Sequence, residues 1–384
     1  MTTMRACVLC GAGRLELRDA ERPLPRAHDV LVQVSAVGVC GTDFHIVSGE
    51  SNYNLDERGE PIPLEVEPQV LGHEITGVVR DKGHAVRDLA EGDPVVIDQG
   101  IHCSSARRTP PCEYCRAGDS HQCEHYAEHG ITGLPGGFAE YVCVPAVNCV
   151  RIHSDLPPVE AALVEPLACV IHASDRAMRA EARYPLVSKV KERGAKTALI
   201  LGAGPAGLLF VQWLRNGLGF EGTLLVSEPD EKKRALAERF GAETIDPRAV
   251  DPVGVVLEKT MGRRAEFLIE ASGAGSAFAQ IPGLVRKQAT VLLYGIGHGG
   301  ASLELLNPLQ WKEPTLVASV GASGGFERDG RPSVYRRALE CIESGKVRVT
   351  PLVTHRYEGL ERIPQAFGGD HERPGYVKGV VELG

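Results

Sequence analysis

The sequence lacks several features that define whole classes of protein. No apolar run approaches the roughly 20 residues that a membrane-spanning helix needs, and Met1–Gly13 shows no basic-then-apolar secretory pattern. Basic residues are not in excess, because 42 Lys and Arg stand against 50 Asp and Glu, giving a formal net charge of −8. These absences argue against a membrane protein, an exported protein and a protein with a broad nucleic-acid-binding surface.

Cysteine is comparatively abundant in a chain of otherwise ordinary composition. Hydrophobic residues make up 43% and charged residues 24% of the 384 residues, which excludes a disordered or fibrous chain and predicts two or three domains. The 11 cysteines are odd in number and accompany no export signal. We therefore expect a cytoplasmic protein whose thiols bind metal or serve in catalysis, rather than a disulfide framework.

The pattern of expected elements changes near residue 158. Before it, short strands separated by turn residues predict a β-rich lobe. After it, apolar strands such as 196–202 alternate with helical segments, which is typical of a parallel sheet with helices on both faces. Strand-rich sequence returns near the end. We therefore predict an α/β protein with a β-rich domain over 1–165 and 326–384 and a doubly wound cofactor domain over 166–325.

A glycine motif follows the first strand of the predicted cofactor domain. The hexapeptide GAGPAG has the pattern GxGxxG and lies between an apolar strand and an apolar helix. Gly202 permits a tight turn, Gly204 lets the backbone approach a pyrophosphate, and Gly207 lets helix and strand pack closely. Pro205 and Ala206 open the helix, whose N-terminus favours an anion. A generic glycine-rich turn is the weaker alternative to a Rossmann dinucleotide site.

Glu228 supplies the second half of this fingerprint. It directly follows the apolar run 223–227 and lies about 20 residues beyond Gly207. A carboxylate there accepts hydrogen bonds from the adenosine ribose and repels a 2′-phosphate, so it favours NAD over NADP. The alternative is an N-cap for the helix that begins near Glu231, a role that Asp230 can also fill.

Two short segments carry residue types suited to zinc. One runs from Cys40 through Thr42 and Asp43 to His45, and the other contains the pair His73-Glu74. Cysteine and histidine are common zinc ligands, and a catalytic zinc site keeps one position open. Either segment alone is also compatible with a structural role.

The motifs together resemble the zinc-dependent branch of the medium-chain dehydrogenase/reductase superfamily. The stretch GHE-x2-G-x5-G-x2-V beginning at Gly72 matches that family's zinc signature, and VCGTDFH, GGFAEYV, EPLAC and GAGPAG extend the likeness over essentially the whole chain. The resemblance implies a GroES-like catalytic domain beside a Rossmann domain. It also implies hydride transfer from the secondary alcohol of a polyol, sugar or hydroxy amino acid to NAD, with zinc lowering the pKa of the substrate hydroxyl.

The same resemblance implies the zinc ligands. Cys40 and His73 match catalytic ligands, and Glu165 stands where alcohol dehydrogenases have a third cysteine, as in the sorbitol, butanediol and threonine dehydrogenase branch. Zinc with one thiolate and one carboxylate sums to zero charge, whereas a second carboxylate competes for the open position. We therefore expect Glu165 to bind and Glu74 to be an alternating or outer partner.

Further roles follow from the resemblance alone. Thr42 matches the hydroxyl that hydrogen-bonds the substrate oxygen, and His45 the outer end of a proton relay through the nicotinamide ribose. Asp43 matches a carboxylate that orients His73. Lys378 matches a basic residue that approaches the cofactor pyrophosphate.

A second group of cysteines matches the structural zinc lobe of the same family. Its last three ligands are expected to be Cys112, Cys115 and Cys123. The position of the fourth ligand is occupied by Thr109, so Cys103, across an apparent insertion, is the nearest candidate. Four thiolates form a closed tetrahedral site. The alternatives are a lost site, or His102 or His121 as the fourth ligand.

Segment 46–69 carries six acidic residues and one basic residue, Arg58. We expect a long loop that acts as a mobile lid or an oligomer contact near the zinc and disfavours anionic substrates; a solvated surface insertion is the alternative.

Other functions remain in competition with a polyol dehydrogenase. A zinc-free quinone or enoyl reductase and a non-enzymatic zinc-binding protein share this fold. The retained Cys40, His73 and Glu165 argue against the first, and the retained Thr42 and His45 argue against the second. A glucose or aldehyde-type dehydrogenase of the same family is a further alternative. We expect a small-molecule alcohol or polyol substrate, no nucleic-acid or membrane partner and, by resemblance, a homodimer or homotetramer.

Overall fold

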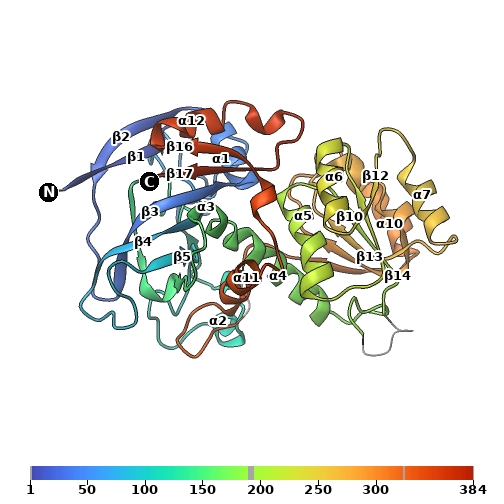
Figure 1. The fold of residues 1–384 in the computed structure, drawn as a ribbon, viewed down its shortest axis with the longest axis horizontal. Coiled ribbons are helices and arrows are strands. Elements are labelled where there is room, and N and C mark those ends of the chain that lie inside the picture. The colour runs from blue at the N-terminus through green and yellow to red at the C-terminus, as the bar shows by residue number, and fades with distance from the viewer. Residues whose placement is uncertain (1, 189–193, 323–324, 384) are drawn as a thin grey trace. The chain divides into compact units, whose positions relative to one another are not determined.

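The computed structural model describes residues 2–188, 194–322 and 325–383, and it divides into two compact units (Figure 1). Unit 1 comprises Met1–Ala168, Ser323–Glu343 and Val353–Gly384, and unit 2 comprises Cys169–Ala322 and Ser344–Leu352. The boundaries suggested by the sequence differ from this division by three residues at each junction, at 166–168 and 323–325, and by the segment 344–352. Gln212 of unit 2 explains the difference at 344–352, because its amide donates to the carbonyl of Arg348 and accepts from its N–H.

Unit 1 is built on a seven-stranded sheet of order β16-β17-β3-β4-β5-β9, with β8 also paired to β3. A β1–β2 hairpin and a short β6–β7 pair complete its β-structure. The strands are β1 (Thr3–Leu9), β2 (Leu15–Glu21), β3 (Asp29–Val39), β4 (Glu74–Lys82), β5 (Pro94–Ile97), β6 (Gly100–Ile101), β7 (Ala127–Glu128), β8 (Tyr141–Pro145), β9 (Cys149–Arg151), β16 (Val353–Glu358) and β17 (Lys378–Glu382). The helices are α1 (Gly41–Ser48), α2 (Glu113–Ala117), α3 (Pro158–Ala161), α11 (Ser333–Glu343) and α12 (Ile363–Ala366).

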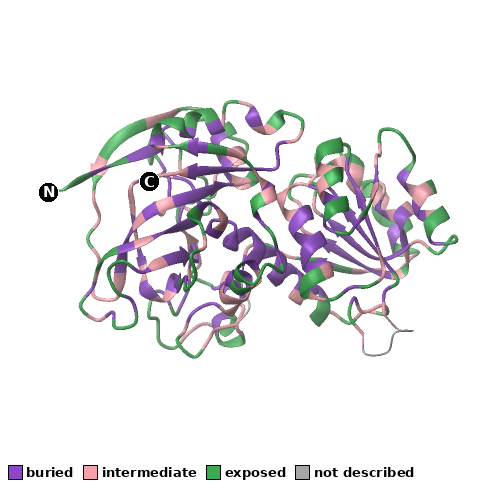
Figure 2. Ribbon diagram, viewed as in Figure 1, coloured by how far each residue is buried: buried purple, intermediate pink, exposed green. Residues whose placement is uncertain are grey.

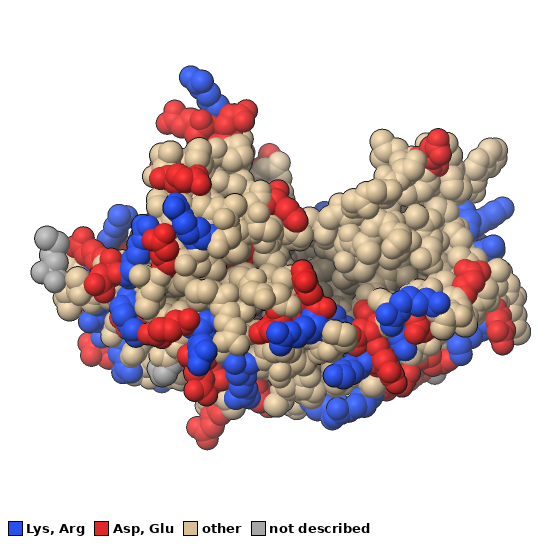
Figure 3. Space-filling view, turned by 90° about the horizontal axis from the view of Figure 1, so that it is seen from above, with Lys and Arg blue, Asp and Glu red and all other residues tan. Residues whose placement is uncertain are grey.

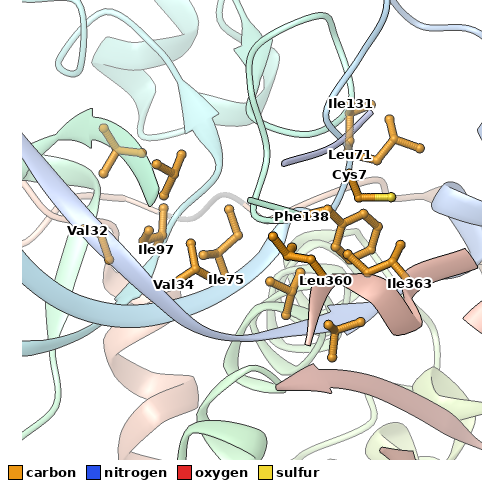
Figure 4. Packing of buried hydrophobic residues seen from close by; sticks show 14 of the residues in the cluster. Cys7, Val32, Val34, Leu71, Ile75, Ile97, Ile131, Phe138, Leu360 and Ile363 are labelled. Carbon is orange, nitrogen blue, oxygen red and sulfur yellow. The ribbon is translucent and has the colours of Figure 1, made fainter. Parts of the chain in front are cut away.

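The apolar core of unit 1 gathers around Phe138. Figure 4 shows Ile75 and Phe138 packed with Leu360 and Ile363 from the C-terminal part of the chain, all of them buried. Burial of each such side chain stabilises the fold by about 1.5–3 kcal/mol. The core therefore packs both ends of the chain into one unit and stabilises the sheet that carries the candidate zinc ligands.

Unit 2 is a parallel six-stranded sheet of order β12-β11-β10-β13-β14-β15. Its central strands are buried along their length (Figure 2). The strands are β10 (Thr197–Leu201), β11 (Thr223–Ser227), β12 (Glu243–Ile245), β13 (Ala265–Glu270), β14 (Val285–Leu293) and β15 (Thr315–Ala318). The helices are α5 (Pro205–Gln212), α6 (Glu231–Arg239), α7 (Pro252–Lys259), α8 (Gly275–Phe278), α9 (Ile281–Leu284) and α10 (Leu306–Gln310), and α4 (Val164–Arg179) contains the boundary between the units.

The strand order of unit 2 is that of a dinucleotide-binding fold. Numbered within the unit it reads 3-2-1-4-5-6, and it reverses between β10 and β13, where such sheets bind their ligand at the carboxyl ends of the strands. The predicted α/β fold, a β-rich domain joined to a doubly wound parallel sheet, is confirmed.

Some local predictions needed correction. The apolar sequence over 159–179 predicts one continuous helix, but the structure divides it, because α3 ends at Ala161 and α4 begins at Val164. The edge strand β16 was not predicted, since its sequence VTHRYE is polar at every second position and offers no apolar run. Among the described residues, no helix combines the length and apolar character needed to cross a bilayer. Charges of both signs are interspersed on the face drawn in Figure 3.

Candidate metal and cofactor sites

Cys40, His73 and Glu74 come together in unit 1, and we call them the catalytic group. Cys40 is the N-cap of α1 directly after β3, while His73 and Glu74 stand at the start of β4. The two strands pair antiparallel with Gly38 opposite Glu74, which brings the segments side by side. One ligand atom of each residue lies within 4.8 Å of the others.

The chemistry of this group suits a bound cation. His73 and Glu74 are buried, and within the described part of the chain His73 Nδ1 and Glu74 Oε2 have no hydrogen-bond partner. Burial disfavours a charged imidazole, but the Asp43 carboxylate and the Cys40 sulfur outweigh it and raise the pKa of His73 well above its ordinary value. A centre that favours positive charge, with sulfur, nitrogen and oxygen donors, fits zinc.

Asp43 fastens the two segments to each other. Its Oδ2 accepts a hydrogen bond from the Cys40 N–H at 2.9 Å, and its Oδ1 accepts one from the Gly72 N–H at 3.3 Å. Oδ1 also lies 3.5 Å from His73 Nδ1. The carboxylate is fully buried, so it stands where it can steer His73, as the sequence suggested. That steering role stays a prediction.

The two candidate glutamate ligands have different partners. Glu74 Oε1 forms a buried ion pair with Lys378 Nζ at 2.5 Å, whereas Glu165 Oε1 accepts a hydrogen bond from Gln99 Nε2 at 3.1 Å. Among the described residues, the ligand atoms of Glu165 do not join the catalytic group. Lys378 neutralises Glu74, which weakens the charge argument against Glu74 as a ligand. The contact between Glu74 and Lys378 was missed, because nothing in the sequence links positions so far apart.

Thr42 and His45 both lie on α1. Thr42 Oγ1 is 3.8 Å from Cys40 Sγ, which places the hydroxyl beside the catalytic group. The His45 side chain is 42% exposed, and its Nδ1 lies 2.7 Å from Glu50 Oε2. The contact between His45 and Glu50 was not expected from the sequence, although Glu50 lies shortly after the end of α1. The relay roles of Thr42 and His45 stay predictions.

Four cysteines of unit 1 converge on a second centre, which we call the cysteine lobe. The four Sγ atoms all lie within 4.8 Å of one another, and they belong to Cys103, Cys112, Cys115 and Cys123. The Sγ–Sγ distance is 3.6 Å for Cys103–Cys123 and 3.9 Å for Cys112–Cys123. Tetrahedral coordination with Zn–S bonds of about 2.3 Å separates sulfurs by about 3.8 Å. The four side chains therefore fit a closed zinc site.

Backbone N–H groups approach the sulfurs of this lobe, while burial raises the pKa of Cys115 and Cys123. The N–H of Cys112 lies 3.4 Å from Cys103 Sγ, and that of Cys115 lies 3.5 Å from Cys112 Sγ. The Cys115 N–H is the main cause that lowers the pKa of Cys112 to about 6. The histidines considered as substitutes have other partners: His121 Nδ1 lies 2.8 Å from the Tyr126 hydroxyl, and His102 Nδ1 lies 3.5 Å from the Ser105 N–H.

The glycine motif of unit 2 has the shape that a pyrophosphate requires. Gly202 directly follows β10 and has a φ of 96°, a conformation that favours glycine. A Cβ on Gly207 would meet the Gly202 carbonyl oxygen at 2.1 Å, whereas a Cβ on Gly204 would meet nothing within 4 Å. Gly202 thus permits the turn, Gly207 permits the close packing, and Gly204 leaves open space before α5, which begins at Pro205.

Glu228 reaches back to this loop from the end of β11. Its Oε2 accepts the Ala203 N–H at 2.7 Å, and its Oε1 accepts the Asp230 N–H at 2.9 Å. The helix cap is Asp230, whose Oδ1 accepts the Lys233 N–H at 3.0 Å. Glu228 is thus not the N-cap of α6, and its carboxylate lies beside the glycine loop.

Segment 46–69 is organised by asparagine side chains. Its first residues complete α1, and its centre contains a single bridge between Leu55 and Pro61. Asn52 Nδ2 donates to the Ile62 carbonyl at 2.7 Å, and Asn54 Nδ2 donates to Glu67 at 3.1 Å. The expected long loop is present. Its role as a lid or oligomer contact stays a prediction.

Comparison with known proteins decides the family. Residues 26–154 match the alcohol dehydrogenase GroES-like domain, and residues 205–344 match the zinc-binding dehydrogenase domain. An L-threonine 3-dehydrogenase of Pyrococcus abyssi is 32% identical over 353 residues, covering 92% of this chain and 90% of its own. The chain belongs to the zinc-binding dehydrogenase family.

Other members of the family agree with this assignment. The sorbitol dehydrogenase of Arabidopsis thaliana is 29% identical, covering 92% of this chain and 87% of its own. A structure described as a zinc-binding dehydrogenase of Sinorhizobium meliloti 1021, bound to NADP, has 31% identity and a TM-score of 0.80 over the whole of both chains. The predicted family, fold and reaction class are confirmed: this dehydrogenase is a zinc-dependent oxidoreductase that uses a nicotinamide cofactor and acts on small alcohols.

Proposed function

We propose that this dehydrogenase oxidises the secondary alcohol of a polyol, sugar or hydroxy amino acid, with NAD as the hydride acceptor. The observation that carries the proposal is the convergence of Cys40, His73 and Glu74, with the buried Glu74 Oε2 left without a partner among the described residues. When bound, zinc supplies Lewis acidity that lowers the pKa of the substrate hydroxyl, and NAD supplies the hydride-accepting ring. We further propose that Glu165 is the third protein ligand and that Glu74 alternates with it.

The chain's own residues handle the proton and hold the site in shape. Thr42, next to Cys40 on α1, hydrogen-bonds the substrate hydroxyl. His45 passes the proton to solvent, which its half-exposed ring allows. Asp43 holds the segments of Cys40 and Gly72 together through their N–H groups, and so keeps the ligands in place.

NAD is favoured over NADP by the position of Glu228. Its two oxygens already accept the N–H groups of Ala203 and Asp230, so the carboxylate is fixed, and its remaining lone pairs suit ribose hydroxyls. Arg234, an arginine near it in sequence, donates to the Glu228 and Pro229 carbonyls. The related Sinorhizobium meliloti structure is bound to NADP, so the preference of this dehydrogenase between NAD and NADP has to be measured. Lys378 is proposed to approach the pyrophosphate while paired with Glu74.

We also propose a homodimer or homotetramer assembled along β15. This strand ends the sheet order of unit 2, and Leu316 in it and Val320 after it are half exposed. Trp311, just before the strand, is 85% exposed. An edge strand with apolar neighbours is a natural surface for pairing with a second copy. A cytoplasmic location belongs to the same proposal, because a four-cysteine zinc site needs reduced thiols.

The test is a turnover panel with zinc analysis. Polyols, aldoses, inositols and threonine are each offered with NAD and with NADP, and reduced cofactor is measured alongside the zinc content of the protein. We expect turnover of at least one secondary alcohol with NAD, and its loss in Cys40→Ser. Zinc-loaded protein that oxidises none of the panel, or reduces quinones instead, contradicts the proposal.

A further inference from the structure

Gln99 connects two carboxylates beside the catalytic group. It follows β5, and its side chain is 2% exposed. Its Nε2 lies 3.1 Å from Glu165 Oε1 and 3.4 Å from Glu128 Oε1. Its Oε1 accepts the Tyr335 hydroxyl at 2.5 Å. Because that hydroxyl donates to the amide oxygen, the amide nitrogen must face the two carboxylates.

The bridge continues toward the cysteine lobe. Glu128 Oε1 also accepts the Tyr126 hydroxyl at 3.0 Å, and that hydroxyl lies 2.8 Å from His121 Nδ1. His121 stands between Cys115 and Cys123 in the chain. A continuous chain of hydrogen-bonding groups therefore runs from the lobe to Glu165.

The amide lets two acids share one buried region. An amide NH2 has two hydrogens, so it can give one to Glu128 and one to Glu165. Without those donors the two carboxylates would each lose a hydrogen bond that offsets their burial and their mutual repulsion. Burial already raises the pKa of Glu128, which shows how little solvent stabilises its charge.

The two candidate zinc-ligating glutamates are therefore restrained by unequal partners. Glu74 is paired with the buried ammonium of Lys378, and Glu165 with the neutral amide of Gln99. A neutral donor holds a carboxylate less tightly than a charged one at close range. Movement of the Glu165 carboxylate toward the metal therefore has to break or turn its hydrogen bond with Gln99.

We propose that Gln99 is the positioning residue for Glu165. Its amide orients the Glu165 carboxylate and so sets how readily Glu165 alternates with Glu74 at the metal. The inference rests on the proposed zinc site of Cys40, His73 and the two glutamates. Tyr335 acts one step further out by fixing the orientation of the amide.

The test replaces Gln99 with methionine, which keeps the length of the side chain and removes its donors. Full-length protein is loaded with cobalt(II) in place of zinc, and the visible spectrum, the metal affinity against a chelator, kcat and KM are measured. We expect Gln99→Met to shift the spectrum and to lower metal affinity or kcat about 10- to 100-fold, as loss of a ligand's hydrogen-bond partner does in metal sites. Tyr335→Phe should shift the spectrum in the same direction by less.

A double variant shows whether the effect passes through Glu165. In a Glu165→Gln background the further change Gln99→Met should have little effect, because the carboxylate it positions is gone. The matched control is Gln212→Met, which removes a buried glutamine that bonds Arg348 in unit 2 and should leave the spectrum unchanged.

Either of two results overturns the inference: an unchanged spectrum and affinity in Gln99→Met, or an equally large effect in the Glu165→Gln background. If Gln99→Met does not fold, Tyr335→Phe decides, and an unchanged spectrum there counts against Gln99. Failure of the proposed function is separate, since it shows as wild-type protein that is fully loaded with zinc and turns over no alcohol.

Discussion

The two units carry their functional residues in different ways. In unit 2 the cofactor residues lie on two adjacent parallel strands. Gly202 and Gly204 are in the loop that follows β10, and Glu228 follows β11. In unit 1, Cys40 and Lys378 come from opposite ends of the chain. They meet because β17, which begins at Lys378, pairs with β3, which Cys40 directly follows.

The two sites also differ in the forces that build them. The loop of unit 2 offers backbone N–H groups and a helix N-terminus, which need no side-chain charge. The catalytic group of unit 1 depends on charges that offset one another, as the Glu74–Lys378 pair shows. Substitutions of charged or metal-binding residues in the catalytic group should therefore disrupt the metal site of unit 1 and leave cofactor binding in unit 2 intact. A substitution of Glu228 should instead alter cofactor binding and leave the metal site intact.

The largest effect is expected for Cys40→Ser. Loss of the thiolate should remove the catalytic zinc and with it several kcal/mol of stabilisation of the reacting oxygen. At about 1.4 kcal/mol per factor of ten, kcat/KM should fall about 1000-fold or more. Zinc content should fall by one ion per chain, while the NAD dissociation constant, measured by fluorescence quenching, changes little.

The matched control is Cys143→Ser, which changes a half-buried cysteine outside both cysteine groups. It should keep full zinc content and turnover. Cys40→Ser protein that keeps both zinc ions and its activity would show that the catalytic group is not the metal site.

The next largest effect separates the two glutamates. Glu165→Ala should reduce zinc occupancy and lower kcat/KM about 100-fold or more, because a ligand is lost, whereas outer partners usually account for 10- to 100-fold. Glu74→Ala should retain more zinc than Glu165→Ala, but it should leave the buried Lys378 ammonium without its carboxylate partner. Zinc analysis and steady-state kinetics on both variants are the measurement. Normal zinc and turnover in Glu165→Ala, with both lost in Glu74→Ala, reverses the assignment.

Much of this architecture could be predicted from sequence. The glycine loop was readable because its residues are consecutive and stand between an apolar strand and an apolar helix. Cys40 and His73 were readable because their short motifs match a known family. The cysteine lobe needed only one unusual assignment, Cys103, and the structure brings that sulfur to the other three.

The rest depended on pairings that no spacing encodes. Gln99 looks like any polar residue after a strand, and its contact with Glu165 exists only once the start of α4 lies beside the loop that follows β5. The Glu74–Lys378 pair requires the last strand of the chain to join the sheet. β16 escaped notice because its exposed alternate positions are polar, so the apolar signal of a buried strand was absent.

A third prediction contrasts the two metal centres within unit 1. Cys112→Ser should open the closed four-sulfur site, whose metal contributes to folding rather than to chemistry. A loss of about 2–3 kcal/mol lowers Tm by roughly 5–10 °C in a unit of this size. Cys40→Ser should shift Tm less, because that site keeps Asp43 and the strand pairing that hold it. Differential scanning calorimetry on both variants checks this; a larger Tm loss in Cys40→Ser would invert the contrast.

The smallest effect is expected for Glu228 in unit 2. Wild-type enzyme should use NAD with at least about tenfold higher kcat/KM than NADP, equivalent to about 1.4 kcal/mol. Glu228→Gln keeps an acceptor for the Ala203 N–H but removes the charge that repels a 2′-phosphate, so the ratio should fall toward one. Zinc content should stay at the wild-type level, since the change lies outside unit 1.

Asp230→Asn provides the matched control for this variant. Asn keeps the cap of α6, because it can still accept the Lys233 N–H, and it removes a charge two residues from Glu228. If the ratio depends on the Glu228 carboxylate itself, Asp230→Asn leaves the preference for NAD in place. If both variants lower the ratio equally, general negative charge near the loop sets the preference. Wild-type enzyme that uses NAD and NADP equally well leaves Glu228 with no part in the choice of cofactor, and its carboxylate then serves only to fasten the glycine loop to β11.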